Sequence, residues 1–275
     1  MIDISQFRIK LINAIESNDI VLPTLPEVAL KVRDEAENEN TTAKKLAEII
    51  VTDPAISARL LQVANSAMYR PRTPIENVQM AIARLGNKLV KSLVTSLAMK
   101  QIYQATTDFM EQKLRQVWEE SVQVAAVSKV LSQNIPSLVN EQAMLAGLVH
   151  NIGSLPILTM AESFSDLSGN EQMLEDLIHT LYPEIGGIIL KSWDFPEVIA
   201  MVPTEHHNLE RKHDGEADYA DLVMVARIQL GLDDVPMEKW ANISAFDRVG
   251  LDAEINIIDV EDTAEDIESV KNALI

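Results

Sequence analysis

The sequence predicts an all-α protein built as a two-lobed helical bundle. Hydrophobic residues make up 47% of the 275 residues, whereas aromatic residues reach only 4% and glycine occurs 9 times. This composition, rich in Ala, Leu, Ile, Val and Met, favours helices over a β-sandwich. Apolar residues recur at helical spacing, and the polar and apolar alternation that is typical of strands is missing. No sequence period of about twenty to fifty residues repeats, which argues against a solenoid.

The net charge and the missing residue types narrow the classes of function. The formal net charge is −19, which repels phosphate backbones and anionic lipid surfaces. We therefore expect neither nucleic acid nor a membrane as a partner. Cysteine is absent, so His, Asp, Glu and Asn are the available metal donors. The N-terminal sequence has interspersed charges and no apolar signal segment, so we expect a soluble, cytoplasmic protein.

The first helices are indicated by apolar spacing and by prolines. Apolar residues at helical spacing predict an amphipathic helix over 4–16. Pro23 and Pro26 then predict an extended segment that leads into a second helix and packs on one of the lobes. After the polar run ENENTT, a third helix is expected to begin at Thr41 or Thr42.

Three further helices complete the first predicted lobe. Asp53 is expected to cap a helix that has a proline at its first position. Thr73 and Glu76 form a capping-box pattern that predicts the start of the next helix, which Gly86 closes. Asn87 can cap the helix that comes after it.

The apolar period stops near residue 105, and this position divides the predicted lobes. Ala105 to Asp108 is the best internal boundary, because Asp108 can cap a long helix that runs to about residue 133. We assign 1–104 to an N-terminal helical lobe and 105–275 to a C-terminal helical lobe.

Apolar runs and capping residues indicate the other helices of the C-terminal lobe. A strongly apolar helix ends at His150, and a short apolar helix containing Pro156 comes next. Thr263 and Asp266 predict the cap of a final acidic helix that docks on the protein. The other stretches expected to be helical are 171–181, a separate helix after Pro183 around Gly186, and 217–232.

Several sequence motifs resemble one known family. These are LPTLPEV, DPAISARLLQVANSA, a helix ending in RLG, AGLVHNIG, and WDFPEVI followed by two histidines. Together they resemble the HDOD family, the HD-related output domain of bacterial signalling proteins, over about 21–209. The resemblance implies a C-terminal lobe like that of HD phosphohydrolases, in which histidines and aspartates hold divalent metals. The GYP motif of the related HD-GYP phosphodiesterases is missing.

The resemblance also places the family's metal ligands on this chain. The first His falls at Glu120, and the His-Asp pair falls at His150 and Asn151. A further His falls at Tyr182, and the closing Asp falls in the helix that carries Arg227. His150 is thus the one ligand of these that the chain retains. A carboxylate neutralises a bound cation, whereas Asn151 is neutral and Arg227 is positive.

The remaining histidines are weaker candidates. His206 and His207 belong to the resembling segment, but adjacent helical residues point about 100° apart, so we expect one to pack inward and the other to be exposed. His179 and His213 are expected at the surface. We predict no bound metal; a metal, if present, would use His150, Glu120 and Asn151. The degenerate site is instead expected to form a ligand pocket, with Glu120, His150, Asn151, Tyr182, His206, His207 and Arg227 as its residues. The structural alternative for His150 is a buried imidazole bonded to backbone.

Three functions compete. The first is a non-catalytic output or scaffold module of signal transduction, which binds signalling proteins of unknown identity or a small ligand. The second is a metal-dependent phosphohydrolase with unorthodox ligands. The third is a purely structural dimerising protein. A homodimer is compatible with each of them, and metal content separates the second from the other two.

Overall fold

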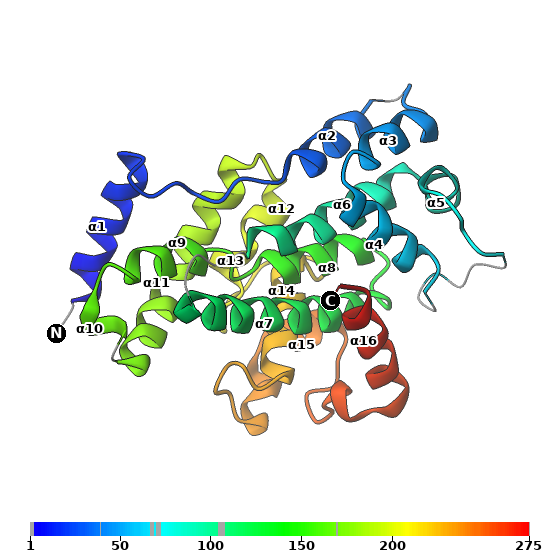
Figure 1. The fold of residues 1–275 in the computed structure, drawn as a ribbon. Helices are drawn as coiled ribbons and strands as arrows, with labels where there is room; N and C mark the ends of the chain where they lie inside the picture. Colours follow the sequence, from blue (N-terminus) through cyan, green and yellow to red (C-terminus); the bar gives the residue numbers. More distant parts are fainter. Residues whose placement is uncertain are drawn as a thin grey trace.

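The protein folds into helices throughout the part of the chain that the structure describes. The computed structural model describes residues 3–38, 40–66, 69, 73–103, 108–168 and 170–274. Among these residues no strand occurs, so the predicted all-α class is confirmed. Two closely paired helices, α7 (Asp108–Ser132) and α8 (Asn140–Val149), lie side by side at the middle of an elongated molecule (Figure 1).

The helices before α7 follow the predicted order. Thr42 and Asp53 cap their helices with side-chain oxygens that accept backbone N–H groups at 3.0–3.2 Å, as predicted. The elements are α1 (Ile4–Glu16), α2 (Glu27–Ala36), α3 (Ala43–Ile50), α4 (Pro54–Ala64), α5 (Val78–Leu85), α6 (Asn87–Met99) and the 3-10 helix η1 (Lys100–Ile102).

The predicted start of α5 is wrong. The helix begins at Val78, and Asn77 caps it by accepting the N–H of Met80 at 2.8 Å. The physical reason lies in Asn65, whose side chain donates to the carbonyl of Ile75 and accepts its N–H, both at 2.8 Å. This clamp uses the backbone groups of Ile75 outside a helix, so the Thr73 to Glu76 capping pattern forms no helical turn.

The helices after α8 pack around the central pair from several directions. Figure 1 shows α15 and α16 along one flank of α7, opposite α2 to α6. Further along the chain come α9 (Ser154–Ala161), α10 (Ser165–Ser168), α11 (Glu171–Ser192), α12 (Glu197–Ala200), α13 (Val202–Glu205), α14 (Tyr219–Gln229), η2 (Met237–Asn242), α15 (Ser244–Val249), η3 (Ile257–Asp259) and α16 (Glu261–Leu274).

Two predicted boundaries in this part of the chain are also wrong. Helix α11 runs unbroken through Pro183, because the buried residues on both sides of the proline keep one helical face against the core. That burial outweighs the cost of an interior proline, about 3 kcal/mol. The final helix begins at Glu261, before the predicted cap at Thr263. Its buried face still docks, as expected of the acidic helix.

Helices α7 and α8 pack closely because one of them carries a glycine at the contact. A Cβ atom on Gly147 would lie 2.4 Å from the Cα of Ala125, which is far inside van der Waals contact. The two backbones therefore lie so close together that only a residue without a Cβ atom fits at this position. This close approach sets the position of His150, which caps the C-terminal end of α8.

The N-terminal segment crosses over to the later part of the chain. In α1, the ring of Phe7 lies 5.4 Å from that of Phe164, and Arg8 forms an ion pair with Glu184. The extended segment before α2 is fixed by Trp193, whose indole N–H donates to the carbonyl of Pro23 at 2.8 Å. The predicted packing of this proline-rich segment is confirmed. The division into 1–104 and 105–275 stays a prediction, and residues 104–107 lie outside the described residues.

One stretch, Asn140–Ala161, is long and apolar enough by composition to cross a membrane. It comprises α8 and α9, and 89% of its most apolar window is buried inside the protein. Core helices of globular proteins pass the same test of length and hydropathy. This stretch is therefore the centre of the fold, and it positions the polar cluster around His150.

Candidate functional site

His150 is fully buried at the junction of α8 with α9. Its Nδ1 lies 2.6 Å from the carbonyl oxygen of Gly147, so this nitrogen carries the proton and donates. Its Nε2 then accepts a hydrogen bond from Nη1 of Arg227 at 2.9 Å. Burial lowers the pKa of His150, and the neighbouring Arg227 charge lowers it further. The imidazole is therefore neutral with both nitrogens in use, as the structural alternative for this residue expected.

Arg227 comes from α14 and lies between the residues that would hold a metal. Its Nη1 also donates to Oε1 of Glu120 at 2.6 Å, and its other nitrogens bind the Asp233 carboxylate at 2.9–3.3 Å. The side chain is 4% exposed, so two carboxylates compensate a charge that is almost fully buried. Burial opposes the ionisation of Glu120, but the Arg227 guanidinium beside it holds the pKa of this carboxyl below its usual value.

Asn151 faces α7 rather than His150. Its Oδ1 accepts a hydrogen bond from the hydroxyl of Ser121 at 2.7 Å, and its Nδ2 donates to the carbonyl of Val117 at 3.2 Å. Both ends of the amide are therefore engaged with one helix. Its carbonyl oxygen is already an acceptor, which reduces what it can offer to a cation.

Tyr182 joins the two adjacent histidines. Nδ1 of His206 lies 2.7 Å from the carbonyl of Val202, so its Nε2 is the acceptor for the Tyr182 hydroxyl at 2.9 Å. The Nε2–H of His207 then donates to the same hydroxyl oxygen. Burial lowers the pKa of His206 well below its usual value. As predicted, one histidine packs inward; His207 is half-buried, less open than expected.

The structure brings the seven predicted pocket residues into one cluster. The rings of His150 and His206 lie 5.3 Å apart, which connects the Arg227 group to the Tyr182 group. A cavity of about 180 Å³ adjoins the cluster. Its walls include Glu120, Asn151, Tyr182 and Arg227. That these residues form a functional pocket stays a prediction.

Two features of this region were missed in the sequence. The first is Asp233, which forms an ion pair with Arg227. A buried arginine requires a carboxylate partner, so the acidic residues that follow α14 were candidates. The second is the position of His179, which is exposed as predicted but lies one helical turn before Tyr182 and also lines the cavity. The spacing of three residues places both on one face of α11.

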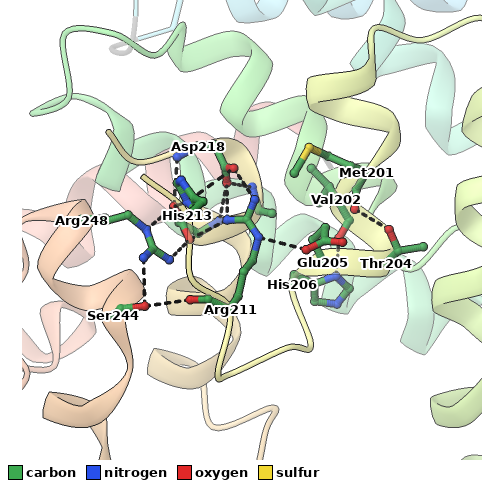
Figure 2. A network of polar contacts seen from close by, with 12 residues as sticks. Met201, Val202, Thr204, Glu205, His206, Arg211, His213, Asp218, Ser244 and Arg248 are labelled. Carbon is green, nitrogen blue, oxygen red and sulfur yellow. Dashed lines mark hydrogen bonds and ion pairs between the residues drawn. The ribbon is translucent and has the colours of Figure 1, made fainter. Parts of the chain in front are cut away.

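A second polar network lies beside His206 and was not predicted (Figure 2). Asp221 is fully buried and accepts hydrogen bonds from Arg211 at 2.9 Å and from Arg248 at 2.6 and 2.9 Å. His213, expected at the surface, is only partly exposed and contacts the same carboxylate at 3.0 Å. This network ties the start of α14 to α15 and to the preceding loop.

A divalent metal does not fit at the family's metal position on this chain. The Arg227 guanidinium hydrogen-bonds both Glu120 and His150, so a positive group already uses the donors that a cation would need. Asn151 adds no negative charge, and its oxygen is bonded to Ser121. With these donors already engaged by Arg227 and Ser121, too few remain for a hydrolytic metal centre.

The helical arrangement and the His150 cluster define a protein with an HD-like fold. A family model for the HDOD domain matches residues 22–209, and the chain belongs to the HDOD domain family. The resemblance that the motifs indicated is therefore confirmed.

Solved structures agree with this assignment. A protein of Shewanella amazonensis SB2B, provisionally named a metal-dependent phosphohydrolase, is 32% identical, with a TM-score of 0.88 and coverage of 99% of both chains. An HDOD domain protein of unknown function from Geobacter sulfurreducens is 19% identical, with a TM-score of 0.73 and coverage of 98% of this chain and 99% of that one. The second likeness shows the fold alone.

One curated relative is also similar in sequence. An uncharacterised protein of Treponema pallidum (strain Nichols) is 22% identical over 202 residues. The match covers 68% of this chain but 38% of that protein, so the chain spans well under half of its relative's length. The activity and the partners of this chain are therefore matters of proposal.

Proposed function

We propose that this HDOD protein is a non-catalytic output or scaffold module of signal transduction that acts by binding a protein or a small ligand. The observation that supports the proposal is the Arg227 side chain, which bonds to both Glu120 and His150. A metal-activated hydroxide requires a metal ion that coordinates water at such a position, and a buried guanidinium cannot coordinate water in this way. The pocket then serves to stabilise the fold or to sense a ligand.

The size of the cavity bears on what is bound. Sites for small organic ligands usually measure roughly 300–1,000 Å³, whereas the cavity beside Glu120 measures about 180 Å³. A cyclic dinucleotide is too large for such a space without rearrangement. This favours a signalling protein as the partner, in the cytoplasm, with an external face of the bundle as the contact surface.

A metal-dependent phosphohydrolase is the alternative. The observation in its favour is the 32% identity, over nearly the whole chain, to the Shewanella protein that carries this provisional name. In this alternative Glu120, His150 and Asn151 would hold the metal after Arg227 had moved away. Such a movement would leave Arg227 with Asp233 as its remaining carboxylate partner.

Hydrolysis of bis(p-nitrophenyl) phosphate with excess Mn²⁺ tests the proposal against its alternative. The wild type and a His150→Ala variant should release p-nitrophenol at the same background rate, because neither forms a metal centre. Contaminating activity would be equal in both samples. A Mn²⁺-dependent rate that occurs in the wild type and disappears in the variant would establish the hydrolase instead.

Affinity capture from the native cell tests the partner side of the proposal. The full chain serves as bait, and a denatured sample of the same chain serves as the control. The proposal expects a signalling protein that binds the folded bait only. Size-exclusion chromatography with light scattering on the same sample measures whether the chain is a homodimer.

A further inference from the structure

A second group of potential metal ligands lies beside the degenerate site. His179, His207 and Asp233 each offer one ligand atom, and these three atoms lie within 4.8 Å of one another. The residues come from three separate elements: α11, the turn after α13, and the loop after α14. Only His207 belongs to the pocket that the family resemblance predicts. The group therefore differs from the HD ligand set, in which His150 is central.

The chemistry of the three residues selects a class of metal. Two imidazoles and one carboxylate suit Zn²⁺ and neighbouring transition metals, whereas Mg²⁺ and Ca²⁺ prefer oxygen ligands throughout. Zinc binds nitrogen at about 2.0–2.1 Å, which sets neighbouring ligand atoms of a tetrahedral site roughly 3.4 Å apart, so any pair near the 4.8 Å limit must move closer together. His179 is exposed and can change rotamer to do so. Three protein ligands leave a position for water or for an anion.

Two of the ligands are already oriented by their neighbours. Arg227 binds the Asp233 carboxylate through two nitrogens and fixes its plane. His207 donates its Nε2–H to Tyr182, which leaves Nδ1 as the unprotonated nitrogen. Outer hydrogen bonds of this kind hold metal ligands in place and set the histidine tautomer. Arg227 also repels a cation, but Glu120 and Asp233 together outweigh its charge.

The described residues contain a second group of potential metal ligands, but its carboxylates already accept hydrogen bonds from arginines. His213, Asp218 and Asp221 also have ligand atoms within 4.8 Å, but Arg211 and Arg248 bind there (Figure 2). A carboxylate offers about four acceptor positions. Asp221 already receives contacts from Arg211, Arg248, His213 and the N–H of Asp218. By contrast, Oδ2 of Asp233 receives a single hydrogen bond, at 3.1 Å, among the described residues.

We propose that His179, His207 and Asp233 form a site for a zinc-class transition metal, outside the position of the HD metal. The ion connects α11, the turn after α13 and the loop after α14, and so closes the edge of the cavity that His179 lines. It stabilises the pocket region, and its open coordination position is available to water or to an anionic ligand. The site does not depend on whether the protein is a hydrolase.

Isothermal titration calorimetry of ZnCl₂ into the full, tag-free chain tests this site. We expect one ion per chain in the wild type. His179→Ala should weaken binding by at least the roughly tenfold that loss of an outer-shell partner already causes. Its exposed side chain makes no hydrogen bond among the described residues, so the variant folds. Asp233→Asn should weaken binding as well. The matched control, His213→Ala, should bind zinc like the wild type.

The failure of this site and the failure of the proposed function give different results. The metal site is overturned if the wild type binds no zinc, if His179→Ala binds it unchanged, or if His213→Ala loses it. Thermal melts of these four proteins add a second readout, since zinc should raise the melting temperature of the wild type and of His213→Ala only. Hydrolysis that depends on His150 would overturn the proposed function while leaving these results unaffected.

Discussion

At the scale of single residues, Arg227 determines what the pocket can bind. One guanidinium satisfies the Nε2 of His150 and the carboxylates of Glu120 and Asp233 in a nearly buried position. Each of these partners would carry an uncompensated polar group if the arginine were removed. The bonds to His150 and Glu120 would have to break before a metal could bind at His150. The residue thus links the stability of the pocket to its proposed lack of hydrolytic activity.

His150→Ala should lower the free energy of unfolding by on the order of 1–3 kcal/mol, because it leaves a cavity and an unpaired Gly147 carbonyl. Urea unfolding of wild type and variant measures the difference. The exposed His179→Ala serves as the control and should change stability little. Excess Mn²⁺ should not alter the difference in the free energy of unfolding between wild type and His150→Ala. A difference in unfolding free energy that grows with Mn²⁺ would argue for a metal at His150.

Asp221→Asn should destabilise the protein strongly, by about 3–5 kcal/mol, because it leaves the buried ends of Arg211 and Arg248 undercompensated. Urea unfolding at neutral pH measures this loss. The exposed Asp262→Asn should have almost no effect. Equal effects of the two substitutions would contradict the proposed role of the network.

The same carboxylate should make the fold sensitive to acid. Burial would raise the pKa of Asp221, but Arg248, the Asp218 N–H and His213 lower it below its usual value. The folded state therefore holds this proton less tightly than the unfolded state does, so the stability it contributes is fully present near pH 7. That stability begins to fall near about pH 5 and is lost as the pH drops through the unfolded-state pKa of about 3.9 to the lower pKa of the folded state. Unfolding free energies measured between about pH 7 and 3 should fall less steeply in Asp221→Asn than in the wild type, mainly below about pH 5. A steeper fall in the variant would contradict this assignment.

At the scale of elements, the contact between α7 and α8 sets the geometry of the site. Gly147→Ala would place a methyl group 2.4 Å from the Cα of Ala125. Forcing these backbones apart should cost at least about 1–3 kcal/mol and should lower the melting temperature. Gly187→Ala is the matched control, since its added methyl meets only the exposed Thr204 side chain, at 3.2 Å, and no backbone atom. Similar melting temperatures for the two variants would refute the role of this contact.

Most elements could be predicted from the sequence, because their signals are local. Apolar periodicity and the caps at Thr42 and Asp53 involve residues a few positions apart. The errors arose where a distant partner decides the outcome. Asn65 reaches ten residues along the chain to hold Ile75 outside a helix, and tertiary burial carries α11 through Pro183. No local pattern contains either contact.

The same distinction applies to the candidate site. The position of His150 at a buried helix end, and the positive charge brought by Arg227, could be predicted from the motifs. The sequence could not reveal that Asp233 completes the charge balance, or that His179 lies beside His207 and Asp233. Those relations depend on how α11, α13 and α14 meet. They exist only in the folded chain.

At the scale of the whole molecule, an HDOD fold brings together the residues at the expected ligand positions, and one of these residues is an arginine. The core helices position His150, Tyr182 and His206 together, yet a guanidinium lies where a cation would be coordinated. The net charge of −19 repels phosphate backbones, so the absence of a nucleic-acid partner stays a prediction. The proposed function therefore requires that this protein operates without a metal at His150.

A crystal structure grown with excess Mn²⁺, with diffraction recorded at the manganese edge, is the decisive test of this requirement. We predict guanidinium density between Glu120 and His150, with no anomalous peak within coordination distance of Nε2 of His150. A peak at His179, His207 and Asp233 would be compatible with the proposed function. A manganese ion bound by His150 together with Glu120 or Asn151 would contradict it.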